Sequence, residues 1–390
     1  MKKTLLTTIL VAILAISTLG AADFELVFGS PTIDQHPEIL IGFVPTAAKL
    51  GVGYTGLNLI EGNETQLALI AGGGYVQRKV WQNPTSGKVQ AYDPIVYDTA
   101  NVEWELRFSQ GFLQSPVEDK DLLTLSASYL GRWDYNKDSM VVGQSRDNGR
   151  PYDIRTLDSY LKSANYSGDI YPDLRGNAQH LGTAFQLQLK LDMMDEQKMY
   201  SNGLLSTFEA KYAPLALNSA LDGVADYYSL TLNTVIAYSP YQIIDNDGQH
   251  WFSITVVDRI NLNWTDGSAF PVYAQGPVSL GRKVRGYNTW TYNTQFTAVN
   301  NFDIRFAGPD WYTIFPRVNL FIDAGYGCGD VFNTDYFKSN MLASAGIQVT
   351  VSFFDFIDLG YQIAYLFTGS KYTEGPDVNV TGSFTFFLDF

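Results

Sequence analysis

The sequence predicts an all-β fold, a transmembrane antiparallel β-barrel of about fourteen strands, with twelve or sixteen as the alternatives. Three observations predict this fold. Residues 378–390 alternate apolar and polar side chains up to the chain end, the chain starts like a secreted protein, and no long apolar helix follows. In lipid every backbone polar group must be paired within the protein, so without apolar helices only a closed barrel can span a membrane.

The first residues are typical of a secretory signal peptide. Lys2 and Lys3 give a positive start, residues 5–19 are apolar, and the small residues 20–22 precede a cleavage site before Asp23. An uncleaved anchor helix is the alternative, but the apolar run is short for spanning a bilayer. The expected divisions are a signal peptide (1–22), a short periplasmic N-terminal segment (23–37) and a transmembrane barrel domain (38–390).

Composition narrows the class of protein. Charged residues make up 17% of the chain and aromatic residues 14%, where soluble domains average about 25% charged residues. A barrel wall explains both values because half of each strand faces lipid and aromatic side chains gather at the interfaces. A large soluble β-sandwich or propeller could share them. The formal net charge of -14 excludes nucleic acid as an expected partner, since such binding depends on basic residues.

Catalysis is not expected. The chain has three scattered histidines (His36, His180 and His250), and it contains no G-x-S-x-G segment. We therefore predict no catalytic residue, no metal site and no cofactor. The single cysteine, Cys328, excludes an intrachain disulfide.

Alternating segments separated by turn residues predict the strands. On one of them Val102, Trp104 and Leu106 alternate with charged residues, and the charged set must face the lumen because Lys or Arg facing mid-bilayer lipid costs about 2–4 kcal/mol. The predicted strands are 38–44, 50–60, 66–78, 97–109, 122–135, 181–193, 202–213, 227–238, 250–264, 290–306, 315–327, 341–353, 357–367 and 378–390.

The connections between these strands alternate in length. With both chain ends periplasmic, short or middling turns fall on the inner side, and the long segments 136–180 and 265–289 fall on the outer side. Bacterial outer-membrane barrels have this asymmetry.

One outer loop carries a candidate site. Arg285 lies in loop 265–289, and Phe321, Asp323 and Gly325 share the inward face of strand 315–327. A loop long enough to fold inward could place the Arg285 guanidinium against the Asp323 carboxylate as a forked, charge-assisted pair. From spacing alone the alternative stays open, namely that Arg285 is a solvated surface residue and Asp323 only lines a wet lumen.

The residues around Arg285 fit such a loop tip. Val284 precedes it, Gly286 permits a sharp or left-handed backbone, and Tyr287 supplies an aromatic body with a polar end.

The order of these segments resembles the barrel of the BamA/TamA superfamily, the bacterial surface-antigen family of outer-membrane assembly and secretion proteins. Its hallmark is a V-R-G-F/Y motif on an inward-folded outer loop, followed by five strands with an F-x-D-x-G motif on the second. Here Val284–Tyr287 precedes five predicted strands, Phe321–Gly325 lies on the second, and the chain ends at Phe390, which resembles the family's C-terminal sorting signal. The resemblance covers 270–390, with a weaker match near 37–56.

The resemblance implies a location in the bacterial outer membrane and a role in inserting or translocating polypeptides or lipids. The implied partners are outer-membrane lipid and lipopolysaccharide, client outer-membrane or secreted polypeptides, and a separate periplasmic partner. Only about fifteen residues separate Asp23 from the first predicted strand, too few for the client-binding POTRA domains of the family, so we expect a POTRA-less member. The alternative function is a passive pore or a structural surface-antigen barrel.

Overall fold

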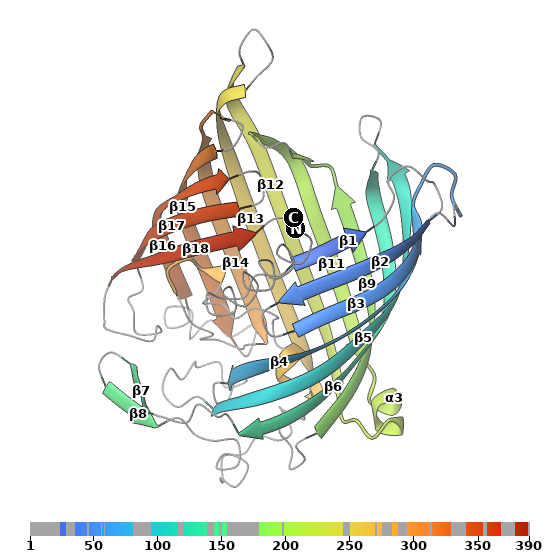
Figure 1. Ribbon diagram of the computed structural model, residues 1–390. Helices are drawn as coiled ribbons and strands as arrows, with labels where there is room; N and C mark the ends of the chain where they lie inside the picture. The colour runs from blue at the N-terminus through green and yellow to red at the C-terminus, as the bar shows by residue number, and fades with distance from the viewer. Residues whose placement is uncertain are drawn as a thin grey trace, which may run out of the picture.

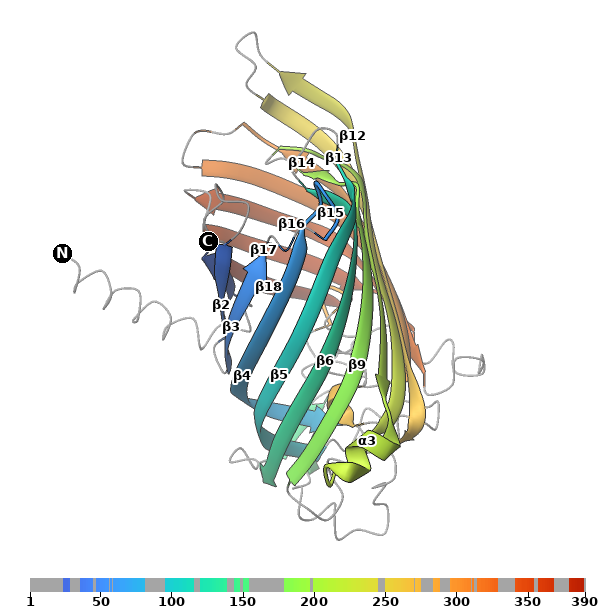
Figure 2. The ribbon, with the colours of Figure 1, turned by 90° about the vertical axis from the view of Figure 1, so that its right-hand side faces the viewer.

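One antiparallel β-sheet forms most of the chain. The computed structural model describes residues 24–28, 36–44, 47–55, 57, 59–80, 95–115, 120–138, 144–147, 150–153, 179–196, 199–244, 250–269, 271–274, 283–287, 295–309, 311, 314–328, 341–353, 357–367 and 379–388. Within them the main sheet has 16 strands. It curves into a wall that surrounds an interior space (Figures 1 and 2).

Neighbours along the sheet are almost always neighbours in sequence, as expected for a chain of hairpins. In sheet order the strands are β1 (Phe24–Phe28), β2 (His36–Val44), β3 (Ala47–Thr55), β4 (Thr65–Val80), β5 (Ile95–Gln114), β6 (Asp121–Asp138), β9 (Gln179–Asp192), β11 (Ser201–Ala213), β12 (Asp226–Ile244), β13 (His250–Ala269), β14 (Phe296–Ala307), β15 (Ile314–Cys328), β16 (Met341–Phe353), β17 (Ile357–Leu366) and β18 (Val380–Leu388). The short β10 (Asp195–Glu196) pairs with β11, and β7 (Gln144–Asp147) pairs with β8 (Arg150–Asp153) in a separate hairpin.

The two faces of the sheet are the reverse of those in a soluble protein. On β15 the outward Leu320 and Ile322 are 42% and 57% exposed, whereas the inward Phe321 and Asp323, which alternate with them, are buried. The same pattern recurs on β9, where Phe185 and Leu187 are exposed. Inward-facing buried polar residues include Ser126, Ser128, Asp134, His180, Asp303 and Asp323. A large exposed apolar face of this kind marks an interaction surface.

The described residues contain one α-helix, α3 (Leu215–Ala220), and one 3₁₀ turn, η3 (Val272–Ala274). No helix in the described part of the chain is long and apolar enough to cross a membrane.

Each of the fourteen predicted strands has a counterpart in the main sheet, from β2 to β18. The prediction omitted β1 and β10, and its second strand, 50–60, is misplaced: β3 is Ala47–Thr55. Residues 59–63 form a turn instead, closed by a hydrogen bond from the Asn63 N–H to the Ile60 carbonyl (3.1 Å) and by a positive φ of 79° at Gly62. The signal peptide (1–22) and Phe390 lie outside the described residues.

The strands at the two ends of the sheet are shorter than those in its middle. β1 has five residues and β18 nine, whereas β5 and β13 have twenty each. The two ends approach each other (Figure 1), but among the described residues no backbone ladder joins β18 to β1. Closure of the barrel therefore stays a prediction.

Candidate functional site

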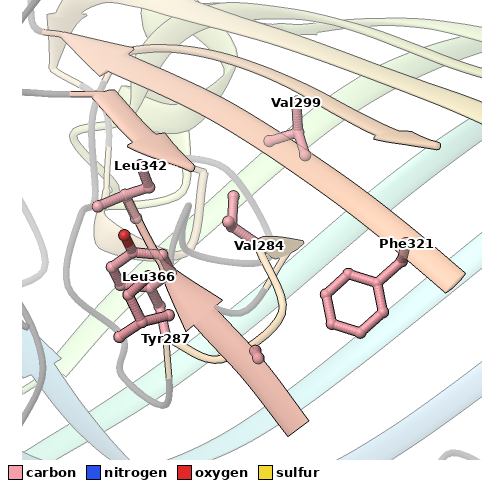
Figure 3. Close-up of a cluster of buried hydrophobic side chains, with 7 residues drawn as sticks. Val284, Tyr287, Val299, Phe321, Leu342 and Leu366 are labelled. Carbon is pink, nitrogen blue, oxygen red and sulfur yellow. The ribbon is translucent and has the colours of Figure 1, made fainter. Parts of the chain in front are cut away.

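The predicted loop motif lies on the inner side of the wall. Val284 and Tyr287 are 0% and 2% exposed, and they pack on side chains that face inward from β14 to β17 (Figure 3). This apolar cluster comprises Val284, Tyr287, Val299, Phe321, Leu342, Ala364 and Leu366. The segment 283–287 is thus folded inward between β13 and β14.

Arg285 and Asp323 are brought together by this packing. The Arg285 backbone N–H and Nε both donate to Asp323 Oδ2 at 2.8 Å, and Nη2 donates to Oδ1 at 2.6 Å. Asp323 is fully buried, and a carboxylate at that position is tolerated only when it is paired and hydrogen-bonded. Two side-chain donors and one backbone donor satisfy both of its oxygens, which is the forked pair that the residue types allow.

A second carboxylate completes the charge balance around Arg285. Its Nη1 lies 2.7 Å from Oδ1 of Asp303, which also pairs through Oδ2 with Arg259. The Arg285 guanidinium lies over the Phe321 ring, 4.0 Å from its centroid, in cation–π geometry. Burial alone would lower the pKa of Arg285, but Asp323 and Asp303 together raise it above its ordinary value. The guanidinium is therefore held charged.

The loop backbone can approach the wall closely because of one glycine. Gly286 has φ of 92°, and a Cβ there would lie 2.7 Å from Ala364 Cβ and 2.8 Å from Leu366 Cδ2. Its carbonyl accepts a hydrogen bond from the Thr381 hydroxyl of β18 (3.2 Å). The Tyr287 hydroxyl donates to the Ala343 carbonyl of β16 (3.1 Å). The loop therefore contacts all five strands from β14 to β18.

Lys283 fixes the start of the motif. Its carbonyl accepts from Asn301 Nδ2 of β14 (2.8 Å), and its ammonium group donates to Asn261 Oδ1 of β13. Burial lowers the pKa of Lys283 to about 8. The sequence prediction included neither Lys283 nor Asp303, although the inward alternation of Asp303 on β14 was an available signal.

The other end of the same connection is attached to a different part of the wall. Tyr273 in η3 follows β13, and its hydroxyl lies 3.3 Å from His180 Nε2 of β9. Its ring lies 4.7 Å from the Arg132 guanidinium of β6, and a Cβ at Gly182 would lie 2.3 Å from its hydroxyl. The connection from β13 to β14 therefore contacts β6 and β9 at one end and β14 to β18 at the other. Its middle part, 275–282, lies outside the described residues.

A cavity of about 450 Å³ with several charged side chains in its lining adjoins Tyr273. Its charged lining residues are paired with neighbours: Ser128 donates to Glu105 (2.8 Å), and Glu209 contacts both Gln188 (3.0 Å) and Lys211 (3.5 Å). Tyr273 itself forms part of the lining. This side of the interior carries charged side chains around a cavity, unlike the apolar cluster around Val284.

Of the remaining predicted residues, Phe321 and Gly325 lie on the buried inward face of β15 with Asp323. No group of three metal-ligating side chains occurs within the described residues.

Comparison with known proteins gives matches only at the level of structure. No family model matches the sequence, and no curated protein matches it. BamA from Haemophilus ducreyi lacking POTRA domains 1–3 has 12% identity and a TM-score of 0.49, with 90% of this chain and 64% of that chain covered. CdiB from Acinetobacter baumannii has 10% identity and a TM-score of 0.46, with 94% and 56% covered. CdiB from Escherichia coli has 9% identity and a TM-score of 0.44, with 96% and 68% covered.

These figures describe a likeness in the path of the chain, and the family resemblance stays a prediction. The chain spans less than two thirds of the length of the first two structures. A likeness at these TM-scores carries no information about activity, substrates or partners.

Proposed function

We propose that the protein is an outer-membrane β-barrel of the BamA/TamA-like assembly or secretion class. In this proposal it assists the insertion or translocation of polypeptides or lipids, and the loop 283–287 braces the wall from inside. The observation that carries the proposal is the docking of Arg285 on the buried Asp323. Through this docking the segment 283–287 contacts the inward side of five neighbouring strands, so it is placed to brace that part of the wall.

The exposed apolar face supports a membrane location. Large side chains such as Leu187 and Ile322 are more than half exposed and alternate with less exposed residues on the inward face. In water this face would drive aggregation, whereas in lipid it is the ordinary outer surface of a barrel. The partners that follow are outer-membrane lipid and lipopolysaccharide.

The position of the brace supports a role near the sheet ends. The loop contacts β14 through β18, and β18 is one end of the sheet. Strands at both ends are short, so few backbone hydrogen bonds are available to close a seam between them. A seam of this kind could open for a client while the loop keeps the adjoining wall in shape. Client polypeptides and a separate periplasmic partner are part of this proposal.

The test is depletion of the protein followed by a survey of outer-membrane proteins and surface lipids. We expect specific outer-membrane components to fall, and we expect wild type but not Arg285→Ala to restore them. Arg259→Gln is the matched control, because Arg259 contacts Asp303 but is not among the partners of Asp323. No change in any outer-membrane component on depletion would contradict the proposal.

A passive pore is the second candidate, and the cavity of about 450 Å³, which charged side chains help to line, favours it. Planar-bilayer conductance separates the two functions. A plugged translocator should give small, irregular openings, whereas a steady open channel that excludes solutes by size would support the pore.

A further inference from the structure

The outward apolar face is interrupted by a polar pair on β13 and β14. Asp258 has the same outward alternation as the exposed Leu262, and its ladder neighbours are Ile236 and Phe302. Asn300 is exposed, and its Nδ2 donates to Asp258 Oδ1 at 2.5 Å. A carboxylate and an amide therefore lie side by side on the surface that the proposed function places against lipid.

The pair lies near the middle of the apolar surface. Along β13 three outward apolar side chains precede Asp258 (Phe252, Ile254 and Val256), and three follow it (Ile260, Leu262 and Trp264). Along β14 the outward Phe302 lies on one side of Asn300 and Ala298 on the other. The apolar band of such barrels is about 25 Å tall, so lipid headgroups do not reach its centre. The hydrogen-bonding capacity of the pair must be met by protein.

Asp258 and Asn300 have hydrogen-bonding groups that their mutual contact does not use. Among the described residues, Asp258 and Asn300 have no side-chain hydrogen-bond partner except each other. A carboxylate oxygen, an amide oxygen and one amide N–H remain. Polar groups facing lipid are costly, and in membranes they commonly serve as contacts between protein segments.

The geometry points to an interface between two copies of this chain, formed around Asp258 and Asn300 on the outer face of β13 and β14. The inference rests on the membrane location in the proposed function. A patch that offers both a donor and an acceptor is self-complementary, so a two-fold axis lets Asn300 of each copy donate to Asp258 of the other. The ladder neighbour of Asn300 on β15 is the small Ala324, and Ala298 is adjacent on β14. Small residues permit the close approach that such contacts require.

The experiment uses the full chain reconstituted in phospholipid vesicles. Copies carrying donor or acceptor fluorophores on a terminal tag are mixed at decreasing protein-to-lipid ratios, and association is measured by energy transfer. Insertion is checked separately by heat-modifiability and protease protection. We expect the wild type to associate and the double variant Asp258→Leu with Asn300→Leu to associate about tenfold more weakly, the size expected for two lost hydrogen bonds.

Two matched variants sharpen the result. Asp258→Asn retains hydrogen bonding and should keep association within about threefold of wild type. Ile347→Ala removes an exposed outward side chain on β16, away from the patch, and should leave association unchanged.

The outcomes separate the two proposals. A wild type that inserts but stays monomeric, or a double variant that associates as well as wild type, would overturn the interface alone. Failure of the wild type to insert into vesicles would overturn the membrane function and the interface with it.

Discussion

The two ends of the connection between β13 and β14 are held in different ways. At the Arg285 end, the guanidinium pairs with two carboxylates beside a buried apolar cluster, and the Arg285 backbone N–H donates a further hydrogen bond to Asp323. At the Tyr273 end, an aromatic ring lies beside Arg132, and its hydroxyl lies against Gly182 and 3.3 Å from His180. The first attachment depends on an ion pair with a fully buried carboxylate, and the second on packing at the edge of a cavity.

This difference predicts unequal strengths. Removing one partner of a buried ion pair costs about 3–5 kcal/mol, because the other charge is left buried without compensation. An aromatic contact with a partly exposed arginine is worth about 0.5–2 kcal/mol. The Arg285 end should therefore contribute most of the free energy that keeps the loop docked. The Tyr273 end should contribute a smaller part, which holds the beginning of the connection from β13 to β14.

The largest effect is expected from Arg285→Ala. It leaves Asp323 buried and unpaired, so the docked loop should lose about 3–5 kcal/mol of stability. Protease cleavage within the loop should become faster while the strand content measured by circular dichroism stays the same. Arg259→Gln is the control and should change cleavage little. Wild-type protease resistance and heat-modifiability in Arg285→Ala would show that the pair does not hold the loop.

The next effect is expected from Gly286→Ala. A side chain at φ of 92° is strained, and its Cβ would lie within 2.8 Å of both Ala364 and Leu366. We expect a loss of about 1–3 kcal/mol in loop docking, read out by the same cleavage rate. Gly73→Ala is a suitable control, since a Cβ there would have no contact closer than 3.1 Å. Equal effects of the two substitutions would argue against close approach of the loop to β17.

A smaller effect is expected from Tyr273→Ala. The substitution removes the ring beside Arg132 and should weaken the start of the connection by about 1–2 kcal/mol. Tyr273→Phe keeps the ring and should cost less. Single-channel recordings should show more frequent openings for Tyr273→Ala than for Tyr273→Phe. If Tyr273→Ala raises the opening frequency as much as Arg285→Ala does, the two ends hold the loop equally strongly, which would contradict the proposed difference.

The smallest effect concerns pH. Burial lowers the pKa of Lys283 from 10.5 to about 8, so between these values the undocked loop binds more protons than the docked one. Docking should therefore strengthen as pH rises from about 8, by on the order of 0.5 kcal/mol over the first unit for this partly exposed side chain. Lys283→Met should abolish the slope. A slope of opposite sign, or one that survives in Lys283→Met, would contradict this assignment.

Much of the fold follows from the period-two alternation. Strand 315–327 was predicted within one residue at each end of β15, because Leu320 and Ile322 alternate with Phe321 and Asp323 along its length. β1 was not predicted, since its five residues are too few to establish a period. The predicted strand 50–60 is misplaced for a different reason: its apolar residues continue past Thr55 into a turn, so the pattern does not mark where the strand ends.

The candidate site was accessible to sequence reasoning only in part. The inward face of Asp323 follows from alternation, and the spacing of Arg285 allowed a pair with it. The roles of Asp303, Lys283 and Tyr273 depend on which strands lie beside the folded-in loop, and this register cannot be read from local pattern. Asp258 interrupts the apolar alternation on the outward face of β13, and only the pairing of the strands shows which residues lie beside it.

The most direct test of the account is a double-mutant cycle between Arg285→Ala and Asp323→Ala, with the protease-cleavage rate of the loop as the readout. If the two side chains hold the loop inward, each single variant should undock it, and the double variant should be little worse. The coupling should then be about 2 kcal/mol or more. Additive effects, with coupling below about 0.5 kcal/mol, would contradict the account.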